Sequence, residues 1–133
     1  MKISQIKKAG AAINEGAWVE NIPGLPGVAL KVCGNANPKA RTIAAEMISN
    51  LPRGKRNHED LAKIERRQIA EVLLVDWKGI QDDDGGALAC TPENIAKIMA
   101  DDDLAVVFTE AVNYAASQVG EQITADIEAD AKN

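Results

Sequence analysis

The sequence has little of what catalysis and metal binding require. Its 133 residues include one histidine, two cysteines and only 3% aromatic residues. A Ser-His-Asp or Cys-His arrangement would have to use His58, which lies between Asn57 and Glu59 and is expected on the surface. One histidine and two distant cysteines also cannot fill the four positions of a zinc site. We therefore predict that the protein is not an enzyme and holds no cofactor or metal.

Long apolar runs and paired cysteines are also missing. No stretch approaches the ~18 consecutive apolar residues of a membrane span, and the first eight residues lack the apolar run of a signal peptide. Cys33 and Cys90 lie far apart, so we favour two free thiols in a reducing cytoplasm over a disulfide. These absences predict a cytoplasmic protein with no membrane segment.

Apolar residues and charges are plentiful, and the charges are unevenly spread. With 46% hydrophobic residues, the length predicts a single domain, residues 1–133, with a core of its own. Residues 1–67 carry a net charge of +6 and residues 68–133 carry −11. These halves are either two solvated faces or a basic end that meets the acidic end of a second copy. The latter predicts self-association that weakens with salt.

The hydrophobic patterns predict a mainly α (small α+β) fold, with four or five helices and one N-terminal β-hairpin. Two short β-rich runs flank a Pro/Gly-rich connection at residues 21–27, and Asn37-Pro38 is a strong helix start. The expected elements are a hairpin at about 17–33, helices at about 38–51, 58–76, 92–100 and 103–128, and an acidic loop at 78–90. Ile3, Ile6 and Ile13 also mark one face of a short helix near the N-terminus.

Two helices carry apolar stripes on which the predicted core depends. The last helix presents a ladder at i, i+3, i+4 spacing, formed by Leu104, Val107, Phe108, Ala111, Val112, Ala115 and Val119. The stripe of the 58–76 helix is interrupted by Gln68, and residues 69–77 could also form a buried strand. We favour a helix there because the residues around Gln68 are good helix formers.

The acidic loop contains Asp82-Asp83-Asp84 followed by two glycines. An EF-hand pattern fails there in each register, because Gly or Ile falls where a calcium ligand belongs. We therefore interpret the segment as a turn in which Asp side chains cap their own backbone N–H groups.

This loop and the helix start after it resemble the signature of tail assembly chaperones from long, non-contractile-tailed phages and prophages. That signature is an apolar helix ending in W-x-G-[IVF], a D-x-D-G turn, a short spacer and an S/T-x-E-N helix start. The matching residues are Trp77, Gly79, Ile80, Asp82, Asp84, Gly85, Thr91, Pro92, Glu93 and Asn94. The chemistry of these residues favours a structural role: Trp77 can cover the end of the apolar helix, Gly79 permits a turn, Ile80 can anchor the loop, and Asp82 and Asp84 can satisfy turn amides.

The resemblance implies a chaperone that binds the tape measure protein, recruits tail tube subunits and is absent from the finished virion. It also implies a longer form of the same protein, made by a minus-one frameshift near the end of the gene. Ala131-Lys132-Asn133 can be encoded by a slippery heptamer, which agrees with such a site.

The alternative is a small nucleic-acid-binding regulator that uses the basic segment 53–67. Its candidate phosphate contacts are Arg53, Lys55, Arg56, Arg66 and Arg67. The acidity of the whole chain, with a net charge of −5, and the scarcity of aromatic residues for stacking make nucleic acid the less favoured partner.

Overall fold

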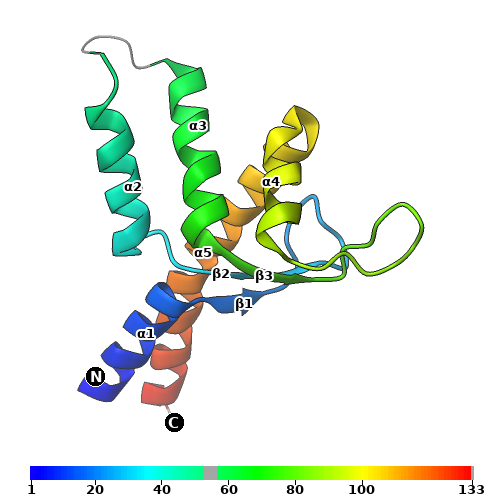
Figure 1. Ribbon diagram of the computed structural model, residues 1–133. Coiled ribbons are helices and arrows are strands. Elements are labelled where there is room, and N and C mark those ends of the chain that lie inside the picture. The colour runs from blue at the N-terminus through cyan, green and yellow to red at the C-terminus, as the bar shows by residue number, and fades with distance from the viewer. Residues whose placement is uncertain (53–56, 133) are drawn as a thin grey trace.

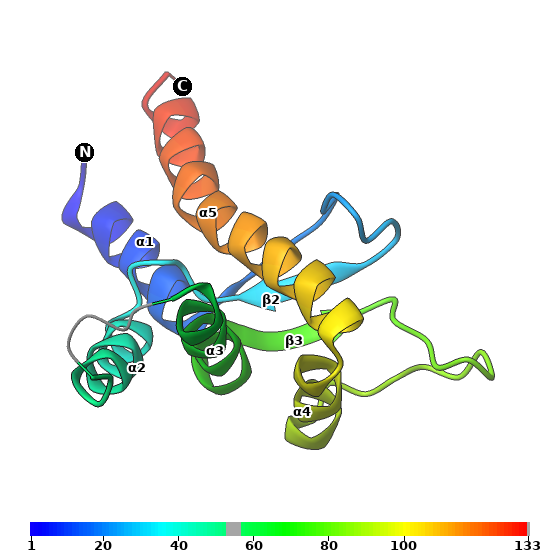
Figure 2. The same ribbon diagram turned by 90° about the horizontal axis from the view of Figure 1, so that it is seen from above.

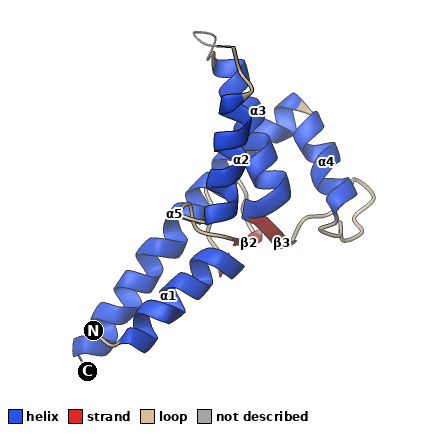
Figure 3. Ribbon diagram, turned by 60° about the vertical axis from the view of Figure 1, so that its left-hand side comes forward, coloured by secondary structure: helices blue, strands red, loops and turns tan. Residues whose placement is uncertain are grey.

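The computed structural model describes residues 1–52 and 57–132. Over these residues it confirms the mainly α fold with a small β part (Figures 1 and 3). The elements are α1 (Ile3–Glu15), β1 (Ala17–Val19), β2 (Ala29–Val32), α2 (Pro38–Ser49), α3 (His58–Gln68), η1 (Ile69–Leu73), β3 (Leu74–Lys78), α4 (Pro92–Ala100) and α5 (Asp102–Lys132).

The core lies between the small sheet and α5. The sheet has the order β1-β2-β3 with both pairs antiparallel, and α5 crosses one of its faces (Figure 2). Leu30 and Val32 at the centre of the sheet are fully buried, as are Val112 and Ala115 on α5. Because many of the inward residues of α5 are alanines, the helix backbone can approach the strands closely.

The ends of the chain lie together, away from the α2–α3 pair. Helix α1 packs against α5, and both termini point to the same end of the molecule (Figures 1 and 2). The end of α1 is held by Asn37, a buried polar residue whose Nδ2 donates to the carbonyl of Asn14 at 3.1 Å.

The predicted helix starts are confirmed. The side-chain oxygens of Asn37, Asn57, Thr91 and Asp101 each accept a hydrogen bond from a backbone N–H in the first turn of the following helix. Such caps satisfy donors that have no partner within the helix. Local sequence alone therefore determines where four of the helices begin.

The predicted helix over 58–76 is wrong in its last part. The α-helix ends at Gln68, a π-helical turn spans Ile69–Leu73, and residues 74–78 form the third strand. Leu74 and Trp77 are buried while Val75 and Asp76 face outward, with a bulge in the pairing to β2. The sheet therefore has one strand more than the predicted hairpin.

Tertiary contacts account for this switch. A two-stranded hairpin is marginal in water, and β3 gives β2 a second hydrogen-bonded neighbour, with Leu30 opposite Trp77. Gln68, which interrupts the apolar stripe, donates through Nε2 to the carbonyl of Ala40 at 2.8 Å. This bond ties the end of α3 to α2 at the point where the chain leaves the α-helix.

None of the helices in the described part of the chain combines the length and apolarity that a bilayer crossing requires.

Candidate functional site

The signature residues form one continuous unit that runs from β3 to the start of α4. Trp77 is 5% exposed and its ring packs edge-on against Phe108, with the centroids 6.1 Å apart. Its indole Nε1 donates to the carbonyl of Leu88 at 2.6 Å. Trp77 therefore covers the core from strand β3 and not, as predicted, the end of an apolar helix. It also fixes the spacer that follows the acidic turn.

Gly79 makes the turn out of β3 possible. Its φ of +88° lies in the left-handed region, and a Cβ there would overlap the carbonyl oxygen of Gly27 in the β1–β2 connection. The next residue, Ile80, is half-buried against the core, and its carbonyl accepts the N–H of Leu88 at 2.9 Å. Ile80 thus anchors the loop as predicted.

The acidic turn is held by the carboxylate of Asp82. One of its oxygens accepts the N–H groups of Asp84 and Gly86, both at 3.0 Å. The prediction that Asp84 also caps turn amides is not reproduced, because Asp84 contributes its backbone N–H to this pair of bonds. Gly85, with φ +88°, closes the turn.

The start of α4 completes the unit. Thr91 Oγ1 accepts the N–H of Asn94 at 3.2 Å, and Asn94 Nδ2 donates to the carbonyl of Ala89 at 2.8 Å. Pro92 and Glu93 occupy the first turn, where a missing N–H and a negative charge are both favourable. The four residues therefore fix the direction of α4 relative to the loop.

Two thiols lie near this framework, and both are free. Burial raises the pKa of the Cys33 thiol above its ordinary value. The pKa of the Cys90 thiol is raised by burial first and by the charge of Asp76 second. Both thiols are therefore held in the protonated form.

The signature thus builds a shape. The side chains of Trp77, Asp82, Thr91 and Asn94 bond the backbone of their own chain, so they position the loop and α4. Within the described ranges, 1–52 and 57–132, no three His, Cys, Asp or Glu side chains are grouped to hold a metal ion, and His58 is exposed.

The basic segment is described only in part. Arg53, Lys55 and Arg56 lie outside the described residues. Arg66 pairs with Asp102 at 3.1 Å and donates to the carbonyl of Met99, while Arg67 pairs with Glu71 at 3.0 Å. Both described arginines are therefore engaged with groups of their own chain.

The structure exposes apolar residues that the sequence pattern had assigned to the core. On α5, Leu104 is 46% and Val107 is 40% exposed, whereas Phe108 and Val112 of the same ladder are buried. Ala105, which lies between them in the chain, is fully buried, so covered and uncovered residues share the same turns of α5. Helical spacing alone could not show which residues at the margin of the apolar stripe stay exposed.

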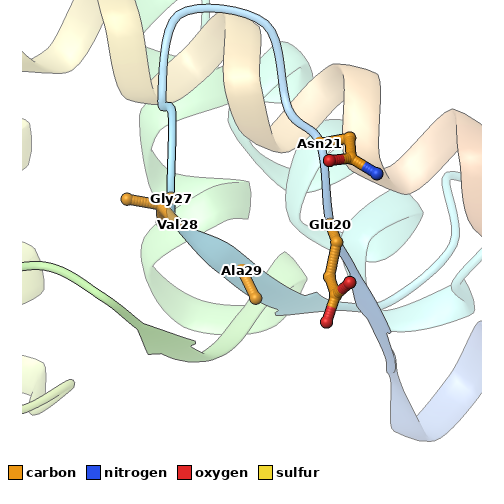
Figure 4. Close-up of a pocket in the computed structure, with 5 residues that line it drawn as sticks. All are labelled: Glu20, Asn21, Gly27, Val28 and Ala29. Atoms are coloured by element: carbon orange, nitrogen blue, oxygen red, sulfur yellow. The ribbon is translucent and has the colours of Figure 1, made fainter.

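Two shallow hollows lie on either side of the end of β1. One, of about 250 Å³, lies between the two limbs of the β1–β2 connection and is lined by Glu20, Asn21 and residues 27–29 (Figure 4). The other, of about 280 Å³, lies between β1 and α5 and is lined by residues 18–21, Tyr114 and Gln118. Neither hollow was predicted from the sequence: the first depends on the path of the β1–β2 connection, and the second combines residues far apart in the chain.

Comparison with known proteins gives one match. Residues 34–133 match the model of a family described as YdaY prophage protein. No match was found among curated proteins or among solved structures.

Proposed function

The chain belongs to the YdaY prophage protein family, and from this premise we propose that it is a tail assembly chaperone. In this proposal it acts by binding and not by catalysis. Its clients are the tape measure protein, tail tube subunits and a frameshift-extended form of itself. It works in the cytoplasm of the bacterial host and is left out of the finished virion.

The observation that carries the proposal is the signature unit at Trp77–Asn94. Its order and spacing resemble those of tail assembly chaperones, and its residues are used to hold a loop and a helix in place. A prophage origin, which the family establishes, agrees with a role in phage assembly. A binding protein needs a shaped surface, and this unit supplies one.

The surface that we assign to the client is the exposed apolar start of α5. Leu104 and Val107 are three residues apart, so they lie on one side of the helix. A pair of this size binds weakly by itself, but many copies along one extended client add their affinities through avidity. Coating a long client by many weak contacts suits a protein that must later be released.

Co-expression with the tape measure protein of the same prophage tests the proposal. We expect the two proteins to be recovered as one soluble complex by affinity capture and size-exclusion chromatography. The double substitution Leu104→Glu with Val107→Glu should remove the complex, because it places charge in the apolar contact.

The matched control is Val106→Glu, which changes a valine that is more exposed, at 57%, and lies on another side of α5. This variant should still form the complex. Recovery of the tape measure protein alone, with the unmodified chain in the monomer fraction, would refute the proposed function.

A further inference from the structure

The outer edge of β1 is open to a partner. β1 forms one edge of the three-stranded sheet and pairs with β2 on its other side. Within residues 1–52 and 57–132 no further strand adds to this edge. An edge strand presents unpaired N–H and C=O groups, which can template another strand.

The directions of the hydrogen bonds of β2 show which residue of β1 faces this edge. The N–H of Cys33 donates to Leu73 on the β3 side, and the N–H of Gly34 donates to Ile13 on the opposite side. Because backbone groups of successive residues in a strand point to alternate sides, Val32 and Leu30 bond β1.

Their partners in β1 are Ala17 and Val19, so these two residues direct their backbone groups toward β2. Trp18 lies between them, opposite Lys31, at the position that does not bond β2. Its N–H and C=O therefore point out of the sheet, along the open edge.

A hollow with side chains of both elements lies at this edge. It measures about 280 Å³ and is lined by residues 18–21, by Tyr114, which is 38% exposed, and by Gln118. Tyr114 and Gln118 are one turn apart on α5, so they form a floor beside the strand. A fourth strand would thus find backbone partners on one side and an aromatic ring beneath it.

The surroundings of the hollow are acidic. Glu20 is exposed at the end of β1, with its carboxylate directed away from the backbone (Figure 4). Gln118 Nε2 donates to Glu121 at 3.3 Å, which places that carboxylate beside the floor, and Glu110 lies one turn before Tyr114. A cation also lies nearby, since Lys78 Nζ is 4.1 Å from the centroid of the Trp18 ring, so the net attraction for a basic segment comes from the three carboxylates.

We propose that the edge of β1 and this hollow bind an extended segment of a partner protein that carries lysine or arginine at alternate positions. The segment adds a fourth strand through the backbone of Trp18. Its basic side chains lie toward Glu20 and its intervening apolar side chains lie on Tyr114. This mode combines backbone pairing for affinity with alternate side chains for specificity.

A second copy of this chain fits the same edge less well. Pairing β1 with β1 of another molecule would bring Glu20, Glu110 and Glu121 of one copy toward the same acids of the other, and like charges repel. The inference also stands apart from the client surface at Leu104 and Val107, so either can fail alone.

A decapeptide that alternates lysine and valine is the probe. Titrated into the full chain labelled with ¹⁵N, it should shift the amide signals of residues 18–21 and of Tyr114 and Gln118, with an affinity that falls as salt is raised. A peptide with glutamate in place of lysine should cause no shift. A third peptide, methylated on every backbone nitrogen, should bind at least about tenfold more weakly, because it cannot pair with the edge.

Two substitutions of Trp18 distinguish the contribution of its backbone to peptide binding from the contribution of its side chain. Trp18→Ala and Trp18→Pro both remove the ring, but only the latter removes the outward N–H, and proline is tolerated at an edge whose N–H faces solvent. Peptide binding should be about tenfold weaker for Trp18→Pro than for Trp18→Ala. Glu20→Lys should weaken binding by a similar factor, about tenfold.

Equal binding of the lysine and glutamate peptides, or shifts confined to other parts of the chain, would overturn the proposal. Concentration-dependent shifts of the same residues without peptide would instead assign the edge to a second copy. If circular dichroism shows that Trp18→Pro does not fold, binding of the methylated peptide to the unmodified chain still tests whether the peptide pairs with the backbone of β1.

Discussion

At the scale of single residues, the signature depends on glycines with positive φ and on hydrogen bonds from side chains to the backbone. Gly79 and Gly85 share the same φ of +88°, yet their surroundings differ. The space around Gly85 is open, whereas a Cβ on Gly79 would meet the backbone of the β1–β2 connection. Alanine substitutions at the two positions therefore distinguish the cost of conformational strain from the cost of steric overlap.

We predict that Gly79→Ala lowers the free energy of unfolding by about 2–4 kcal/mol, because strain and overlap with the Gly27 carbonyl add. Gly85→Ala should cost only about 1–2 kcal/mol, the strain alone. Urea denaturation of both variants measures the difference. Equal losses would show that the close approach of the two loops does not contribute.

The buried thiol of Cys33 makes stability depend on pH. Burial raises the pKa of this thiol in the folded state. At pH values well below the ordinary thiol pKa, Cys33 is protonated in both the folded and the unfolded chain, so the thiol does not lower the free energy of unfolding at those pH values. As pH rises, the unfolded chain loses the proton first, so stability falls.

We expect unfolding free energy to decrease from pH about 8 to about 10, and we expect a smaller decrease for Cys33→Ala. Other groups that titrate in this range contribute equally to both proteins, so the comparison isolates the thiol. An identical slope in the two proteins would contradict the role of Cys33.

At the scale of elements, caps and apolar stripes explain most of the helices. The π-helical turn marks the point at which the predicted helix over 58–76 is wrong. Helix formers up to Gln68 predict α3 correctly, but nothing local indicates that Ile69–Leu73 widens into a π-turn before the chain becomes a strand. The strand is stabilised by β2 and by the burial of Leu74 and Trp77. A short stretch of sequence does not show which distant segments will contact it.

The start of α4 gives a prediction at this scale. Thr91→Ala should lower stability by about 1 kcal/mol through loss of the cap to the Asn94 N–H, and Thr91→Ser should retain most of it. Thermal unfolding followed by circular dichroism compares the two variants. A serine variant as unstable as the alanine variant would mean that the threonine methyl, and not the cap, is what matters.

At the scale of the whole molecule, the fold rearranges the two charged halves seen in the sequence. The basic α1, with Lys2, Lys7 and Lys8 exposed, packs against α5, whose second half carries exposed Glu121 and Glu128 (Figure 1). A basic helix and an acidic helix segment therefore lie side by side within one molecule. The acidic 78–90 loop lies far from the two termini (Figures 1 and 2).

Self-association through charge stays a prediction, now with a defined geometry. We expect weak, concentration-dependent association at low salt, in which α1 of one copy meets the acidic loop of the next, and we expect it to disappear at high salt. Light scattering measures it, and Lys7→Glu with Lys8→Glu should abolish it. A strict monomer at high concentration and low salt would rule this contact out.

The sequence by itself determined the helix starts and the acidic turn, because caps and turns depend on neighbours within a few residues. Only the tertiary structure decided that residues 74–78 form a strand, that Leu104 and Val107 stay exposed, and that Trp18 faces an open edge beside Tyr114. These features depend on which segments meet in space, and an apolar period indicates that a face is buried without showing which segment covers it.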